Sequence, residues 1–170
     1  MGGDPLDIKV AVTAKNGEVT IDFTGTSAQR NVGINCTWVY THVWSVYIMK
    51  CLLCPALPNN DGTFMPIKVI VPEGTFLNPT FPAPVRLKSS SGHFIPDAIV
   101  EALQGVLADR VIAESGNKFS VVFSGRDGKG RAFAESMFIM GGMGARADKH
   151  GLNCLSFPAN SSNLPIEVLE

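Results

Sequence analysis

A segment dense in proline divides this chain of 170 residues and limits how its middle can fold. Between Cys54 and Val85, prolines recur too closely for a long helix or a central strand, because proline lacks the backbone N–H that both structures need. Residues 67–71 lie between two prolines and are apolar enough for a short strand. The segment is too apolar for a disordered linker, so we expect the rest of it to wrap against a folded domain, with a turn at residues 59–62.

The residues before this segment predict a β-hairpin followed by a helix. Apolar and polar residues alternate at 8–12 and at 19–23, and Asn16-Gly17 between these runs is the strongest short signal for a hairpin turn. Residues 37–53 carry aromatic and apolar side chains at helical spacing on several faces. This pattern predicts a largely buried helix that Pro55 closes.

The residues after the proline segment predict a second helix and a second hairpin. A small break at residues 89–92 precedes a helix from about Pro96 to Ala108, with Pro96 and Asp97 in positions typical of a helix start. Its apolar face consists of Ile95, Ile99, Leu103, Val106 and Leu107. Residues 119–124 and 133–140 flank a glycine-rich turn, which indicates a hairpin. The order of elements predicts an α+β fold rather than regular βαβ alternation, and the length suits a single domain over residues 1–170.

Composition and charge narrow the class of partner. Charged residues make up 17% of the chain and the net charge is −1, so no basic stripe is present and nucleic acid is excluded as a partner. His42 and Lys50 interrupt the longest apolar run, and the first residues lack the basic and apolar regions of a secretory signal. We therefore expect a cytoplasmic protein without a membrane partner. A hydrophobic content of 45% predicts that another subunit or the rest of a longer chain covers apolar surface, as in an oligomer.

Four cysteines lie among apolar neighbours, namely Cys36, Cys51, Cys54 and Cys154. Cys51 and Cys54 have the C-x-x-C spacing, but a second pair at matching spacing is missing. This favours reduced, structural cysteines over a zinc site, because a free cysteine in apolar surroundings behaves as a small hydrophobe.

Two loops are candidates for binding. The strand at 19–23 stops abruptly in Thr24, Gly25 and Thr26, and such residues can present backbone N–H groups and hydroxyl oxygens to an anion or an amide. The same residue types also suit a turn or a helix cap. The second loop contains Gly142, Gly144 and Arg146 within residues 141–151. Its glycines permit close backbone approach and its arginine can form a bidentate contact with a carboxylate or phosphate, although a plain glycine turn explains the spacing as well.

No motif assigns a catalytic residue. The G-x-S-x-G nucleophile elbow, the Walker A loop and the dinucleotide fingerprint are all absent from the sequence. His42 lies in an apolar helix and is expected in the core, whereas His93, Asp148 and His150 offer an alternative divalent-metal site that we do not assign. Asn35 and Asn60 are weaker candidates for ligand contact, since each also suits a turn.

Taken in order, several unusual strings resemble those of the hydantoinase B/5-oxoprolinase family, with its N-methylhydantoinase B-type subunits. They are DFTGTSAQ at Asp22–Gln29, GIN at Gly33–Asn35, PNNDGTFMPIKVIVPEGTFLNP at Pro58–Pro79, PAPV at Pro82–Val85, GGMGAR at Gly141–Arg146, and the closing Asn160 with PIEVLE.

The resemblance implies an ATP-dependent enzyme that hydrolyses the C–N bond of a cyclic amide, opening lactam or hydantoin rings. ATP and Mg would act through a partner, the hydantoinase A-type subunit or domain, with phosphorylation activating the ring carbonyl before water attacks. Thr24, Gly25, Thr26, Gly142, Gly144 and Arg146 would then contact the small cyclic amide substrate. The family also has relatives in acetone and acetophenone carboxylases, so a carboxylase-type subunit is an alternative. A non-catalytic structural or interface domain is a second alternative.

The resemblance also implies that the family module is much longer than this chain. Its N-terminal part carries His and Asp positions similar to metal ligands, so any divalent metal is expected there. After GGMGAR the family tends to have Asp-Gly, where this chain has Lys149, His150 and Gly151. We therefore expect an excised middle-to-late portion of the module that is inactive alone.

Overall fold

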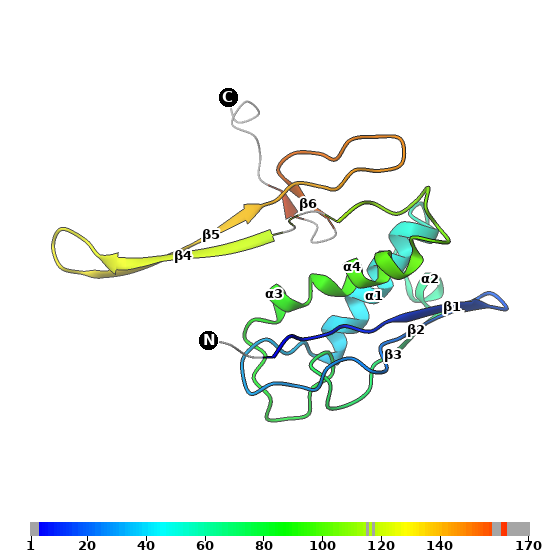
Figure 1. Ribbon diagram of the computed structural model, residues 1–170, viewed down its shortest axis with the longest axis horizontal. Coiled ribbons are helices and arrows are strands. Elements are labelled where there is room, and N and C mark those ends of the chain that lie inside the picture. Colours follow the sequence, from blue (N-terminus) through cyan, green and yellow to red (C-terminus); the bar gives the residue numbers. More distant parts are fainter. Residues whose placement is uncertain (1–3, 115, 117, 158–160, 163–170) are drawn as a thin grey trace. The chain divides into compact units, whose positions relative to one another are not determined.

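The computed structural model describes residues 4–114, 116, 118–157 and 161–162, and these residues form two compact units. Unit 1 comprises the described residues up to Val111, drawn from blue to green in Figure 1, and unit 2 comprises those from Ile112 onward. The mixture of small sheets and a few helices confirms the predicted α+β class. The expectation of a single domain over residues 1–170 stays a prediction.

Unit 1 contains a sheet with the strand order β1-β2-β3. Strands β1 (Ala11–Lys15) and β2 (Glu18–Asp22) form the predicted hairpin. Asn16 and Gly17 at its turn have φ values of 53° and 81°, the left-handed conformations that a two-residue hairpin turn requires. Strand β3 (Ile67–Ile70) confirms the predicted short strand and pairs with β2 in parallel, with Val19 opposite Ile67.

Helices α1 (Trp38–Leu53) and α4 (Phe94–Leu103) contact each other and lie on one face of this sheet, α1 against β3 and α4 against β1 (Figure 1). The Thr37 side chain caps α1 by accepting a hydrogen bond from the backbone N–H of Tyr40. The fully buried side chains between helices and sheet include Ile21, Phe23, Ile48, Met49, Leu77, Ile95 and Ile99. Burial of Phe76 and Leu77 confirms that the proline-dense segment wraps against the domain.

Both long helices differ from the sequence-based prediction. Helix α1 buries six of its residues, among them Val46, Ile48 and Met49, but Val39 and Val43 are 62% and 58% exposed, so its burial is partial. Helix α4 begins at Phe94 and ends at Leu103, so Val106 is 78% exposed instead of continuing the apolar face. The backbone turns at residues 104–106, where Gly105 lowers helix propensity directly after the C-cap.

Two short helices replace elements that were predicted as a turn and a break. Helix α2 (Asp61–Phe64) begins where the Asn60 side chain accepts a hydrogen bond from the backbone N–H of Thr63, so residues 59–62 start a helix instead of forming an isolated turn. Helix α3 (Lys88–Ser91) occupies the predicted break before α4. Asparagine favours both turns and helix caps, which is why the sequence pattern did not separate the two.

Unit 2 is built around a two-stranded ribbon. Strands β4 (Lys118–Arg126) and β5 (Ala132–Met140) pair antiparallel over their full length, which confirms the second predicted hairpin. Strand β6 (Leu155–Ser156) pairs with β7 (Ser161–Ser162). Within the described part of this unit only Gly144 is buried, and no apolar side chain is.

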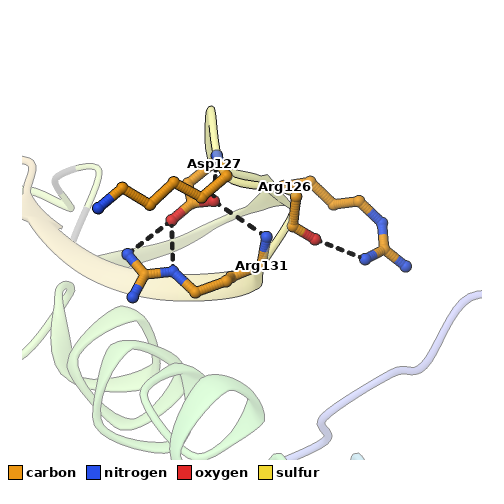
Figure 2. Close-up of polar contacts among 5 residues, drawn as sticks. Arg126, Asp127 and Arg131 are labelled. Carbon is orange, nitrogen blue, oxygen red and sulfur yellow. Dashed lines mark hydrogen bonds and ion pairs between the residues drawn. The ribbon is translucent and has the colours of Figure 1, made fainter.

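Asp127 organises the turn of the ribbon. Figure 2 shows the Arg131 side chain reaching back to the Asp127 carboxylate, where Nε and Nη2 each lie 2.8 Å from Oδ2. The backbone N–H groups of Lys129 and Arg131 donate to Oδ1 at 2.8 and 2.9 Å. Hydrogen bonds from Arg131, first from its backbone and then from its side chain, lower the pKa of the Asp127 carboxyl.

Candidate functional site

The parallel pairing of β2 and β3 brings together the two loops that follow these strands. We call residues 23–37 the β2 loop and residues 71–87 the β3 loop. Both begin at the carboxyl ends of parallel strands, the edge at which open α/β sheets bind ligands. The backbone N–H of Gln29 donates to the Gly74 carbonyl at 2.9 Å, and that of Phe76 donates to the Ser27 carbonyl at 3.1 Å. The two loops therefore form one interlocked structure.

Asn35 is the central polar contact between these loops. Its side chain is fully buried, and its Nδ2 group donates to the carbonyls of Arg30, Val32 and Pro84 at 2.8, 3.1 and 2.8 Å. Its Oδ1 atom accepts from the backbone N–H of Arg30 at 2.8 Å. Because these bonds occupy the amide, Asn35 shapes the β2 loop and fixes it to the β3 loop.

Gln29 makes the second side-chain link. Its Oε1 atom accepts from the backbone N–H of Thr80 at 2.7 Å and from the Thr80 hydroxyl at 3.0 Å. The sequence patterns did not single out Gln29, because its partner lies 51 residues further along the chain.

Thr24, Gly25 and Thr26 form the tight turn at the start of the β2 loop. Thr24 is exposed, and its backbone N–H and hydroxyl both donate to Asp22 Oδ1, at 2.8 and 2.6 Å. Gly25 has a φ of +90°, which glycine adopts readily and residues with a Cβ do not. Buried Thr26 accepts from the backbone N–H of Lys9 and donates to the Lys9 carbonyl, both at 3.1 Å. The turn therefore fastens the N-terminal residues, and Thr24 and Gly25 remain at the surface.

Gly142, Gly144 and Arg146 lie in a hairpin-like loop of unit 2. The backbone N–H of Met143 donates to Leu152 O, and that of Arg146 donates to Lys149 O, both at 2.8 Å. Residue 113 runs alongside, where its N–H donates to Ala145 O at 2.9 Å. A Cβ atom at Gly144 would overlap the Ala113 carbonyl, so this glycine is needed for close backbone approach. Gly142 has a φ of +91°.

Arg146 is half-buried, and its Nε atom is enclosed without a hydrogen-bond partner among the described residues. Asp148 and His150 nearby in sequence are exposed. Thr24, Gly25 and Thr26 belong to unit 1 and the other three candidates to unit 2, so the sharing of one pocket by the six residues stays a prediction.

The histidines pack against aromatic rings or lie at the surface. His42 is half-buried and stacks on Trp38 with ring centroids 5.0 Å apart, and buried His93 packs its ring edge-on against Trp44 at 5.6 Å. Within the described ranges, no three His, Cys, Asp or Glu side chains lie close enough together to hold a metal ion.

All four cysteines are free thiols. Burial raises the pKa of the Cys36 thiol to about 11, and Cys36 Sγ lies 3.5 Å from the Lys88 carbonyl oxygen. Burial likewise raises the pKa of Cys51 and raises that of the Tyr47 phenol to about 12. Cys36 and Cys51 are therefore protonated at neutral pH and are weak nucleophiles, as expected of structural cysteines.

A groove at the C-terminal end of α1 was not predicted from the sequence. It has a volume of about 490 Å³ and is lined by residues 51–57 and Arg110. Arg110 Nη1 donates to the Leu52 carbonyl at 3.1 Å, a contact across 58 residues that no local pattern signals.

The hydantoinase B/oxoprolinase family model matches residues 1–170. A protein of Pseudomonas sp. (strain NS671), provisionally named as the B-type component of a D-/L-hydantoinase, is 34% identical over 97% of this chain, which covers 29% of that protein. The 5-oxoprolinase PfmaA of Pestalotiopsis fici is 31% identical over 99% of this chain and 13% of its own length. The chain thus spans less than a third of these relatives.

Two solved structures share the fold. The ATP-dependent caprolactamase from Pseudomonas jessenii has a TM-score of 0.74 at 21% identity, covering 95% of this chain and 29% of the other. A nucleotide-free acetone carboxylase structure has a TM-score of 0.72 at 20% identity, covering 94% and 22%. In the part of this chain that the structure describes, the helices are too short or too polar to cross a membrane.

Proposed function

The chain belongs to the hydantoinase B/oxoprolinase family, and we propose that it is a segment of an ATP-dependent amidohydrolase that opens lactam or hydantoin rings. The observation that carries this proposal is the family match over residues 1–170. Two relatives, 34% and 31% identical in sequence, support it, because they are named as a hydantoinase component and a 5-oxoprolinase. The proposal concerns the activity of a whole enzyme, because this chain covers only 29% and 13% of the length of those two relatives.

The proposed substrate is a small cyclic amide, which presents one carbonyl acceptor and one N–H donor. The hydroxyl of exposed Thr24 already donates to Asp22, so its free lone pairs are suited to accept a ring N–H. Arg146 is suited to donate to a carboxylate or phosphate oxygen. Gly25 gives the Thr24 turn its conformation, whereas Thr26, Gly142 and Gly144 hold the backbone of the two loops in place.

The nucleotide would be bound outside this chain. The sequence lacks a Walker A loop and a dinucleotide fingerprint, and the loops of the described residues do not provide a phosphate cradle of either kind. We assign ATP and Mg to a hydantoinase A-type partner subunit or domain, and any divalent metal to the family region that has no counterpart here. Four free thiols favour the cytoplasm as the compartment.

The test uses the complete enzyme that contains this chain, co-expressed with its ATP-binding partner. ADP release is followed with 5-oxoproline, hydantoins, caprolactam and small ketones, each with and without bicarbonate. We expect lactam- or hydantoin-dependent turnover that needs no bicarbonate. Bicarbonate-dependent turnover on a ketone would instead place the protein among carboxylases, and turnover that is independent of this segment would indicate a structural domain.

Variants of the same enzyme test the residue roles. Arg146→Ala is expected to lower kcat/KM by roughly tenfold to a hundredfold, because the guanidinium contact to a carboxylate or phosphate oxygen is lost. Arg126→Ala is the matched control, since Arg126 is the exposed last residue of β4 and donates to the Gly130 carbonyl. The assignment of Arg146 is wrong if its variant keeps kcat/KM within a factor of two of the parent enzyme.

A further inference from the structure

The groove at the end of α1 contains two thiols that the proposed function does not use. Cys51 lies in the last turn of α1 and Cys54 is its C-cap, and both line the cavity of about 490 Å³. Each is half-buried, and neither forms a disulfide. The remaining walls are mostly apolar, formed by Leu52, Leu53, Pro55, Ala56 and Leu57.

The backbone around the two thiols is held in place on both sides. The Cys54 N–H continues the helical pattern by donating to the Lys50 carbonyl at 2.9 Å, and Lys50 Nζ donates to the Pro55 carbonyl at 3.2 Å. Arg110 Nη1 donates to the Leu52 carbonyl at 3.1 Å. The two cysteines thus lie three residues apart at a fixed helical end, and both line the same groove.

The charges around the groove suit an anionic complex. Lys50 and Arg110 both donate to backbone carbonyls at this end of the helix, so two cationic side chains lie beside the groove. An apolar wall with two soft donors and nearby cations is a poor site for a hard ion and a suitable site for a soft one.

We propose that Cys51 and Cys54 form a two-coordinate site for a soft monovalent metal ion, for which Cu(I) is the physiological representative. On binding, both thiols lose their protons to solvent and two sulfur–metal bonds form, which gives a complex with a charge of −1 and no change of oxidation state. Lys50 and Arg110 offset that charge. Zn²⁺ fits less well, because it prefers four ligands and no three potential ligands cluster among the described residues.

The test is anaerobic titration of the 170-residue chain with Cu(I) against a chromophoric Cu(I) chelator. We expect one ion per chain, with affinity lowered about a hundredfold or more in Cys51→Ser and in Cys54→Ser, because each removes one of two ligands. Cys154→Ser, which removes an exposed thiol of unit 2, is the matched control and should keep affinity within twofold. Zn²⁺ added at the same concentration should not displace the copper.

A second readout does not depend on how the variants fold. One equivalent of Cu(I) should protect Cys51 and Cys54 of the unaltered chain from alkylation, measured by mass spectrometry of peptides, and should leave Cys154 reactive. Failure to take copper from the chelator, or protection that falls on Cys154 while Cys51 and Cys54 stay reactive, would overturn the proposal.

Discussion

The two units of the chain differ in how much apolar surface they bury. Unit 1 packs two helices on a three-stranded sheet and buries a set of apolar side chains from Ile21 to Leu103. Unit 2 pairs two nine-residue strands, yet Phe119, Phe123 and Phe138 are each more than half exposed. An isolated two-stranded ribbon is marginally stable in water at best. Hydrogen-bond pairing alone therefore gives a regular shape, whereas burial of apolar surface gives stability.

The register of the ribbon shows where its apolar surface lies. Phe119 opposes Ile139, and Val121 opposes Met137, so these four side chains share one face. The other face is mixed, with Ser120 opposite Phe138 and Val122 opposite Ser136. Exposed apolar side chains on a ribbon are typical of a surface that another polypeptide covers, which agrees with the expectation that another subunit or the rest of a longer chain covers apolar surface.

The clearest test of the difference between the units is a matched pair of phenylalanines. Phe23→Ala in unit 1 should lower the free energy of unfolding by about 3–5 kcal/mol, because Phe23 is fully buried. Phe123→Ala in unit 2 should change it by less than about 0.5 kcal/mol, because that side chain is 52% exposed. Urea unfolding of both variants measures the difference. Equal losses would mean that the ribbon has a covered core and that the comparison fails.

The next largest effect is expected at the interlocked loops of unit 1. Asn35→Ala leaves the carbonyls of Arg30 and Pro84 without their buried donor and should cost roughly 2–4 kcal/mol. Asn60→Ala is the control, because this exposed helix cap should cost only about 1 kcal/mol. Thermal unfolding followed by circular dichroism compares them, and similar shifts of Tm would contradict the central role of Asn35.

A smaller, pH-dependent effect is expected from the buried thiol of unit 1. The folded pKa of Cys36 is about 11 against an ordinary value of 9.0, so the unfolded chain releases this proton first. Stability should be fully present below pH 9 and fall by on the order of 2 kcal/mol as the pH rises to 11. Cys36→Ala should flatten this part of the profile. Tyr47→Phe, with a pKa of about 12 for the phenol that it removes, should flatten only the part above pH 10.

The smallest effect is expected at the ribbon turn of unit 2. Hydrogen bonds from Arg131 lower the pKa of Asp127, so its contribution is present above the ordinary Asp pKa and is lost as the pH falls through the lowered value. Asp127→Ala should leave the unfolding midpoint of unit 1 unchanged while broadening the amide signals of residues 126–132 in NMR spectra. A clear shift of the unit 1 midpoint would show that the two units unfold together.

Local signals in the sequence predicted the elements whose causes are local. Asn16-Gly17 identified the first hairpin because only a few residue pairs accept its turn geometry, and Pro55 marked the end of α1. The second helix was predicted to extend to Ala108, but α4 ends at Leu103, shortly before Gly105. This glycine was a signal already present in the sequence. The parallel pairing of β2 with β3 was not predicted, because the partners Val19 and Ile67 are 48 residues apart.

The candidate site was predicted less completely than the fold. The turn at Thr24–Thr26 lies where strand alternation ends, as predicted. Its hydroxyl groups, however, donate hydrogen bonds within the protein, that of Thr24 to Asp22 and that of Thr26 to Lys9. Asn35 was singled out only weakly, since its partner Pro84 lies 49 residues away. Side-chain bonding across such distances follows from tertiary packing, which residue spacing does not encode. The closing motif at Asn160 lies outside the described residues.

The contact between Gly144 and the Ala113 carbonyl has a consequence for how this sequence can change over generations. Every other amino acid carries a Cβ, so any substitution of Gly144 places this atom against the backbone of another segment, whatever side chain is introduced. Only a prior shift of residue 113 would make room. Lineages that drift at neighbouring Ala145, which is exposed, are therefore expected to keep position 144 fixed.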